Sequence, residues 1–333
     1  MSKTNKNTMD MTHGTLWNKI LIFALPLAAS SILQQLFNSI DTAVVGRFAS
    51  SQALAAVGSN SSLIALMINL FIGISLGSNV VIAHYIGQRS EKNIQAAIHT
   101  AIVVALVSGI FVMIFGQFIA KPVLSLMGTP DDVIAKSTLY MRIYFCGMPF
   151  FMMYNYGAAI LRAVGDTKRP LIFLIVSGVI NAVLNLFLVI VFHLDVAGVG
   201  IATVISQLVS CILVLRCLHH TESSYQLHLA KLRIRSVYLK RIFEVGVPAG
   251  IQSTVINISN AMLQSSVNSF GSIAMAGYTA SNNIFGFLYV SVNSFTQACM
   301  SFTSQNYGVK KLKRMDRVMI DCMILSVVVT LIL

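Results

Sequence analysis

Charged side chains are scarce in this chain. Asp, Glu, Lys and Arg make up 10% of its 333 residues, and hydrophobic types make up 56%. Soluble domains carry about 25% charged residues, so the scarcity excludes a soluble globular protein and predicts an integral membrane protein. Backbone groups in lipid must be paired within each span, so apolar runs of the ~20 residues needed to cross a bilayer predict helices. The predicted spans are 16–48, 53–86, 94–118, 133–160, 170–193, 197–218, 240–269, 273–307 and a last one from 318.

Motifs of cysteine chemistry and of catalysis are also missing. The five cysteines show no CxxC spacing, so neither a disulfide framework nor a zinc site is predicted. No HExxH motif occurs, which argues against a membrane metalloenzyme. We predict a protein that is not an enzyme and needs no cofactor. Residues 1–15 lack the apolar core of a signal peptide, and they are predicted to form a cytoplasmic tail.

The formal net charge of +12 by itself suggests nucleic acid as a partner, but the basic residues are unevenly distributed along the chain. If the N-terminus is cytoplasmic, most Lys and Arg fall on the cytoplasmic side. This is the positive-inside pattern, and it predicts a multi-pass protein with a cytoplasmic N-terminus. The excess of basic residues then serves to orient the protein in the membrane and to contact anionic lipid, and no nucleic-acid partner is predicted. The segments concerned are 1–15, 87–92, 161–169, 216–241 and 310–317.

The chain repeats itself with an offset of 222 residues. Ala24-Leu25-Pro26 corresponds to Gly246-Val247-Pro248 and Asn38 to Asn260, and after a one-residue gap Gly87 corresponds to Gly308. Six predicted helices precede the second copy, so both copies start on the same side of the membrane. Transporters with such parallel repeats bind their substrates at the interface between the repeats.

The repeat predicts an all-α membrane protein built as a two-lobe helical bundle. A complete six-helix N-lobe is assigned to 16–218, a cytoplasmic amphipathic linker to 219–239 and a C-lobe to 240–333. The last apolar run reaches only ~24 Å at 1.5 Å per residue, short of a ~30 Å hydrocarbon core. We therefore expect the C-lobe to be truncated within its third helix.

The linker combines apolar and basic residues. This composition predicts a surface segment that lies on anionic lipid. The residues concerned are Leu229, Leu232, Ile234 and Val237, beside Lys231, Arg233 and Arg235.

Asp41 is the most informative residue, because a carboxylate at membrane depth costs at least ~2.5–3.5 kcal/mol on insertion scales and is rarely left there without a use. The other acids lie in tails and loops or, like Glu244 and Asp321, near cytoplasmic helix starts. Asp41 is thus predicted to be the only deep carboxylate. Its expected uses are proton relay, cation binding or pairing with a base.

Polar residues follow one face of several predicted helices. In the first, Ser31, Gln34 and Asn38 share a face with Asp41. Asn181 and Asn185 are one turn apart in the fifth, and carboxylate and amide oxygens together make a ligand set for a hard cation.

Two simpler interpretations of the polar faces stay open. Ser and Thr side chains also form interhelical hydrogen bonds, worth ~0.6 kcal/mol each. The second alternative is a structural salt bridge between Asp41 and Arg142, which leaves the two asparagines unexplained.

The chain resembles the multidrug and toxic compound extrusion (MATE) family of cation-coupled efflux transporters, and its DinF-like branch in particular. The resemblance is carried by Pro26, Asp41-Thr42-Ala43-Val44-Val45-Gly46-Arg47, Ala53-Leu54-Ala55-Ala56-Val57-Gly58, Leu161-Arg162-Ala163-Val164-Gly165-Asp166-Thr167-Lys168-Arg169-Pro170, Asn181-Ala182-Val183-Leu184-Asn185 and Gly198-Val199-Gly200-Ile201-Ala202-Thr203.

The resemblance implies twelve helices in two lobes that open alternately to each face of a bacterial inner membrane. It also implies a cation site on Asp41, Asn181, Asn185 and Thr203. The DinF-like branch commonly has a second Asp where this chain has Asn185. Since no Asp or Glu lies between residues 245 and 310, the coupling is expected to rest on the N-lobe.

We therefore predict a monomeric antiporter that exports drugs or other organic, often cationic, compounds in exchange for H⁺ or Na⁺. Pro26 is a candidate hinge in the first helix. Predicted substrate-lining residues are Gln34, Asn38, Tyr140, Asn257, Asn260 and Gln297. The alternatives are a flippase for lipid-linked sugars, whose cavity should be more basic, and a non-transporting truncated membrane fragment.

Overall fold

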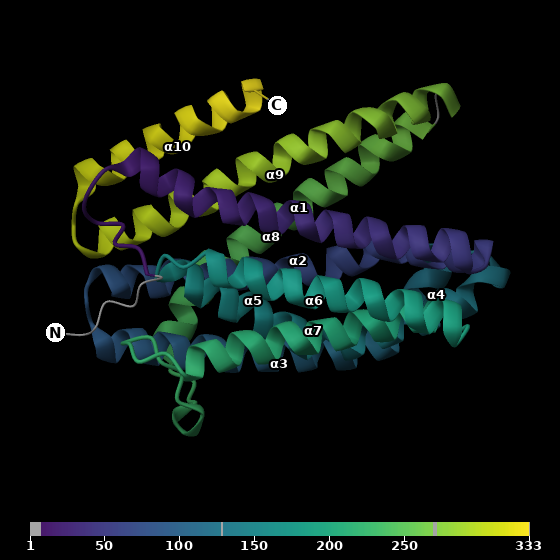
Figure 1. The fold of residues 1–333 in the computed structure, drawn as a ribbon, viewed down its shortest axis with the longest axis horizontal. Coiled ribbons are helices and arrows are strands. Elements are labelled where there is room, and N and C mark those ends of the chain that lie inside the picture. The colour runs from purple at the N-terminus through teal and green to yellow at the C-terminus, as the bar shows by residue number, and fades with distance from the viewer. Residues whose placement is uncertain (1–7, 128, 269–271, 333) are drawn as a thin grey trace.

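The computed structural model describes residues 8–127, 129–268 and 272–332, and the regular structure within them is entirely helical. This confirms the predicted all-α class, and Figure 1 shows the long helices running side by side. The elements are α1 (Leu16–Phe48), α2 (Ser51–Gly87), α3 (Glu91–Leu126), α4 (Asp131–Cys146), α5 (Met148–Ala163), α6 (Lys168–Leu186), the π-helix η1 (Phe187–Val191), α7 (Asp195–His219), the 3₁₀ helix η2 (Leu229–Lys231), α8 (Ser236–Asn268), α9 (Ser272–Gly308) and α10 (Leu312–Ile332).

Five helices in the described part of the chain are long and apolar enough to cross a membrane. They are Leu16–Phe48, Met67–Gly87, Glu91–Leu126, Lys168–Val191 and Asp195–His219. The other predicted spans stay predictions, and residues 1–7 of the predicted tail lie outside the described residues.

The prediction of one helix over 133–160 was wrong. The helix is interrupted at Gly147, where α4 ends and α5 begins, although the backbone angles of Gly147 stay in the right-handed helical region. Pro149 lies in the first turn of α5, where its missing N–H costs no hydrogen bond and its ring resists continuation of the preceding helix. The predicted linker, 219–239, is also shortened, because α7 extends to His219 and α8 already starts at Ser236.

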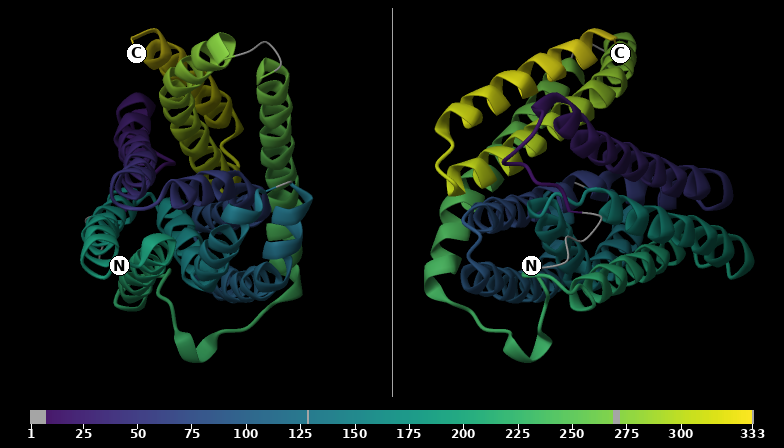
Figure 2. Two further views of the ribbon diagram at one scale, coloured as in Figure 1. Left: turned by 90° about the vertical axis from the view of Figure 1, so that its right-hand side faces the viewer. Right: turned by 60° about the vertical axis from the view of Figure 1, so that its left-hand side comes forward.

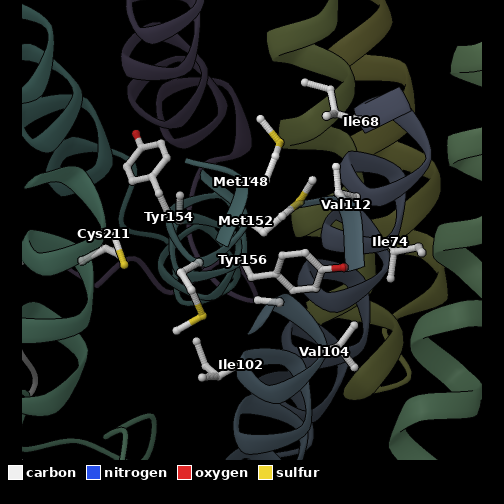
Figure 3. Close-up of a cluster of buried hydrophobic side chains, with 14 of the residues drawn as sticks. Ile68, Ile74, Ile102, Val104, Val112, Met148, Met152, Tyr154, Tyr156 and Cys211 are labelled. Carbon is white, nitrogen blue, oxygen red and sulfur yellow. The ribbon is translucent and has the colours of Figure 1, made fainter. Parts of the chain in front are cut away.

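Two hydrophobic cores hold the helices together. The larger lies among α2–α7 and includes the start of α8 and, near the end of α1, Val44 and Val45. Figure 3 shows part of it, with Met148, Met152 and Tyr156 at its centre. The smaller joins the first half of α1 to α9 and α10, where the rings of Phe23 and Phe302 meet edge to face at 5.6 Å. We call α1–α7 the first lobe and α8–α10 the second lobe. The two halves of α1 therefore belong to different cores.

The lobes meet closely at one end of the bundle, which we call the inner end. It carries the start of α1 and the turns α2–α3 and α9–α10, at the left of Figure 1. Ser301 Oγ donates to Asn79 Oδ1 at 3.0 Å, and Gln305 Nε2 donates to the carbonyl oxygen of Ala163 at 2.7 Å. Toward the opposite, outer end, the ribbons of α8 and α9 diverge from the first lobe.

The N-terminal tail also ties the lobes together at the inner end. Met9 N–H donates to the carbonyl oxygen of Val164 in the first lobe at 3.3 Å. Gly165 has a φ of 88°, which favours glycine, and a Cβ there would lie 2.8 Å from the Met9 backbone. Second-lobe side chains donate to tail carbonyls: Asn306 to Met11 at 3.2 Å, Lys311 to Thr12 at 2.9 Å and Arg314 to Gly14 at 2.9 Å.

Candidate functional site

Asp41 lies in the outer half of α1 and contacts α6 and its neighbour α7 through a chain of hydrogen bonds. Asn185 Nδ2 donates to Asp41 Oδ1 and also to Asn181 Oδ1, the latter at 3.2 Å. Asn181 Nδ2 donates in turn to Thr203 Oγ1 at 3.5 Å. The structure thus brings together the four residues for which a cation-binding role was predicted.

Local sequence explains why these side chains converge. Asn181 and Asn185 are one helical turn apart, so they project from the same face of α6. Gly178, one turn earlier, lets α1 approach, because a Cβ at this position would overlap the ring of Phe37. Thr203 is held by its own helix, since its hydroxyl donates to the carbonyl oxygen of Val199 at 2.9 Å.

The cluster presents oxygen atoms in a buried setting. Asn181 and Asn185 are buried and Asp41 is half-buried. Asn185 Oδ1 has no hydrogen-bond partner among the described residues, so it is an acceptor available to a positive group. A carboxylate, amide oxygens and a hydroxyl fit a proton or a hard cation such as Na⁺. In the described part of the chain no group of three His, Cys, Asp or Glu suits a transition metal.

A cavity of about 850 Å³ adjoins the cluster, lined by residues of α1, α2 and α4–α7. Asp41, Asn181 and Thr203 form part of its wall, as do three residues predicted to contact substrate, Gln34, Asn38 and Tyr140. Asp41 is the only charged residue among the described residues that line it. The cavity is therefore acidic, whereas a cavity for lipid-linked sugars was expected to be basic.

Aromatic residues that the sequence analysis did not assign to the cavity form another part of its wall. They are Tyr144, Phe151 and Tyr154, beside Tyr140. Tyr140 and Tyr144 have ring centroids 6.1 Å apart, and Tyr154 Oη donates to the carbonyl oxygen of Pro170 at 3.0 Å. Because Tyr140 and Tyr144 are four residues apart, they share a helix face, and this spacing could have predicted that both line the cavity. Phe151 and Tyr154 lie 11 and 14 residues after Tyr140, which is also the spacing of one helix face.

The sequence model of the MatE family matches residues 26–187 and 248–333. This chain belongs to the MatE family. It is similar to the probable multidrug resistance protein YoeA of Bacillus subtilis (strain 168), with 30% identity over 93% of this chain and 69% of that protein. The probable multidrug resistance protein YpnP of the same strain is 26% identical over 92% of this chain and 68% of its own length.

Solved structures of MATE proteins share the fold. One, described as MATE in the bent conformation, superposes with a TM-score of 0.89 at 22% identity, covering 96% of this chain and 71% of that one. Another, an outward-facing conformation of a MATE family transporter, gives 0.87 at 22% identity and covers 96% and 72%. MatE proteins are transporters and not enzymes, so this chain is a multi-pass membrane transporter. Its assignment to the DinF-like branch stays a prediction.

Three of the residues predicted to line a substrate site in this MatE chain lie away from the cavity. Asn257 and Asn260 are exposed on α8, and Gln297 is on α9. Asn257 Nδ2 donates to the carbonyl oxygen of Ser253 in its own helix at 2.8 Å. A role for these three, and a hinge role for Pro26 within the continuous helix α1, stay predictions.

The structure decides two points about charged residues that the sequence left open. Asp41 does not pair with Arg142 in the part of the chain that the structure describes, because Arg142 is exposed on α4 and outside the cavity. Asp321, which the sequence places near a cytoplasmic helix start, is buried in α10, and its Oδ2 has no hydrogen-bond partner among the described residues. The position of Asp321 in the sequence indicates where it lies along α10, but it does not indicate which way the side chain points.

Proposed function

We propose that this transporter exports organic compounds, cationic ones among them, in exchange for an inward-moving H⁺ or Na⁺ by alternating access. The observation that carries the proposal is the position of Asp41. It is the only charged residue among the described residues of the cavity wall, and it is hydrogen-bonded to the buried Asn185. One group can thus serve both the coupling ion and a cationic substrate.

The cavity chemistry supports cationic organic substrates. A carboxylate attracts the charge, and tyrosine and phenylalanine faces bind organic cations through cation–π contacts. The names of the relatives YoeA and YpnP, both probable multidrug resistance proteins, agree with this class of substrate. A volume of about 850 Å³ is in the range of drug-sized ligand pockets.

The coupling ion and a cationic substrate compete for Asp41, and this competition couples ion entry to substrate export. A proton or Na⁺ neutralises the single carboxylate, which weakens its attraction for a cationic substrate and favours release. One carboxylate requires one monovalent ion, so we expect one ion per cycle at this lobe. The ion changes the conformational equilibrium only if it binds one conformation more tightly than the other.

Alternating access requires the inner end to open. The lobes are joined there by Ser301 and Gln305 and by the tail, whereas α8 and α9 diverge toward the outer end. We assign this arrangement to an outward-open state with the N-terminus in the cytoplasm. Loading of substrate from the cytoplasm then requires the inner contacts to break.

The test is the substitution Asp41→Asn, which keeps the shape of the side chain and removes its charge. Vesicles containing the protein are loaded with ethidium, a fluorescent organic cation, and efflux is driven by a sodium gradient or by a pH gradient. The gradient that drives efflux by the native protein identifies the ion. The variant should retain less than roughly a tenth of that efflux, since a tenfold loss needs only ~1.4 kcal/mol.

Asp316→Asn is the matched control, because Asp316 is an exposed acid near the start of α10. It should leave efflux unchanged. Full efflux by the Asp41→Asn protein, inserted at normal levels, would contradict the proposal.

A further inference from the structure

The segment between the lobes leaves the bundle sideways. It follows α7 after His219 and enters α8 at Ser236. Figure 1 shows it projecting at right angles to the helices near the inner end, and the end-on view in Figure 2 shows it extending outward from the bundle. Because the helices cross the bilayer, a segment perpendicular to them at their cytoplasmic ends runs in the plane of the membrane surface.

Both ends of this segment are fixed to the first lobe. Tyr225 and Leu227 are buried, and the N–H of Leu227 donates to the carbonyl oxygen of Leu218 at 2.9 Å. The N–H of His228 donates to His99 Nε2 at 3.3 Å. On the far side, the N–H of Arg235 donates to Thr100 Oγ1 at 3.3 Å. The intervening residues are thus held in a defined place against α3.

The residues between these attachments expose apolar side chains. Leu229 is 54% exposed and Ile234 45%, and Val237 at the start of α8 is 60% exposed. In water such a cluster is unfavourable, since it leaves apolar area hydrated. At the boundary between headgroups and acyl chains the same side chains are stabilised.

Basic residues alternate with the apolar ones. Lys231, Arg233 and Arg235 are exposed, and none forms an ion pair within the described part of the chain. No Asp or Glu occurs between Glu222 and Glu244, so the local charge is uniformly positive. Basic groups at this level attract the anionic headgroups of the cytoplasmic leaflet.

We infer that residues 229–237, which we call the linker tip, are an interfacial anchor that binds anionic phospholipid. Leu229, Ile234 and Val237 enter the headgroup boundary, and the guanidinium and ammonium groups bind headgroup phosphates. The inference concerns a contact with lipid and is independent of the substrate and of the coupling ion.

The single tryptophan of the chain makes a direct test practical. Trp17→Phe gives a background without tryptophan, and Leu229→Trp then places one reporter at the linker tip. The protein is reconstituted in phosphatidylcholine vesicles that contain brominated phosphatidylglycerol or, at the same mole fraction, brominated phosphatidylcholine. Bromine near the headgroup end of the acyl chains quenches tryptophan on contact.

We expect quenching by both lipids, at least about twofold stronger with phosphatidylglycerol, because three cationic side chains enrich the anionic lipid locally. The triple substitution Lys231→Gln, Arg233→Gln and Arg235→Gln should remove this difference and leave the quenching by phosphatidylcholine. Phe118→Trp in the same background is the control, because Phe118 is exposed on the membrane-spanning α3 and should be quenched equally by both lipids.

Two results would overturn the inference. If neither brominated lipid quenches the tryptophan fluorescence of Leu229→Trp but aqueous iodide does, the linker tip lies in water. Equal quenching by both lipids, unchanged by the triple substitution, would remove the role of the anionic headgroup. Ethidium efflux by the reporter protein provides a separate check of its folding and does not depend on either result.

Discussion

Two of the helix crossings between the lobes are equivalent in sequence position through the internal repeat, but they differ in chemistry. One is α2 with α8, and the other is α9 with α1. Glycines occupy four positions of the first crossing, and alanine or serine occupies the corresponding positions of the second. The pairs are Gly73 with Ser294, Gly77 with Ala298, Gly246 with Ala24 and Gly250 with Ala28.

The difference changes what lies between the helices. At the first crossing the backbones touch: a Cβ at Gly73 would overlap Gly250, and one at Gly246 would lie 2.5 Å from the Cα of Ile74. At the second crossing the side chains of Phe23 and Phe302 pack against each other, with ring centroids 5.6 Å apart. Lipid gives no hydrophobic drive for helix association, so close packing of small residues supplies the attraction.

The comparison teaches where the molecule can change shape. Side chains can adopt new rotamers when helices shift, whereas two backbones in contact leave no such freedom. The crossing of α2 with α8 is therefore the fixed one, and that of α1 with α9 is the adjustable one. Asp41 is on α1, and its counterpart on α8 is the exposed Leu263. The acid thus lies on the helix whose crossing can adjust.

The largest expected effect comes from moving the acid between the two crossings. A protein with Asp41→Asn and Leu263→Asp should transport less than roughly a tenth as fast as the native protein, a loss of ~1.4 kcal/mol or more. Residue 263 has no counterpart of the Asn185 contact within the described residues, so an acid there lacks its partners. Ethidium efflux from vesicles measures this, and recovery of transport would show that the lobes are interchangeable.

The second prediction concerns the fixed crossing. Gly73→Ala should destabilise the protein by about 1–3 kcal/mol, because the added methyl group must separate two backbones in contact. Gly286→Ala is the matched control in α9, where, among the described residues, no atom beyond the nearby backbone of α9 lies within 4 Å of the added Cβ. It should be neutral or stabilising by up to about 1 kcal/mol. Thermal unfolding in detergent compares the two, and equal effects would refute the proposed fixed crossing.

The third prediction concerns the adjustable crossing. Phe302→Leu should cost about 1 kcal/mol, because a smaller side chain loses part of the edge-to-face contact with Phe23 but can repack. The unfolding midpoint should fall less than in Gly73→Ala. A larger fall would mean that the aromatic pair, and not the glycine crossing, fixes the lobes.

The smallest effect concerns the tail that spans the inner end. Burial alone raises the pKa of Asp10, but hydrogen bonds from the Thr12 hydroxyl and backbone N–H and from His13 lower it overall, from 3.8 to about 2. A lowered pKa means that the ionised form stabilises the folded tail. This contribution is complete above pH 3.8 and is lost as the pH falls through about 2.

Amide hydrogen exchange of residues 9–14 measures this dependence. Protection should be constant from pH 7 to about 4 and decrease below that, whereas the Asp10→Asn protein should show lower protection without this step. Protection in the native protein that stays constant down to pH 2 would contradict the assignment to Asp10.

Sequence by itself determined the membrane-spanning helical character, the internal repeat and the shared helix face of Asn181 and Asn185. These follow from local rules: hydropathy marks a span, and spacing by a helical turn places Asn181 and Asn185 on one face. The joining of these two residues to Asp41 and Thr203 came from family resemblance, and the hydrogen bonds agree with it.

Only the tertiary structure decided the composition of the cavity and the difference between the two crossings. Tyr154 on α5 lines the cavity, while Asn257 on α8 stays outside it. The rotation of each helix about its axis depends on packing against helices far away in sequence, and no local pattern records it. For the same reason the burial of Asp321 was visible only once α9, α10 and α1 were packed together.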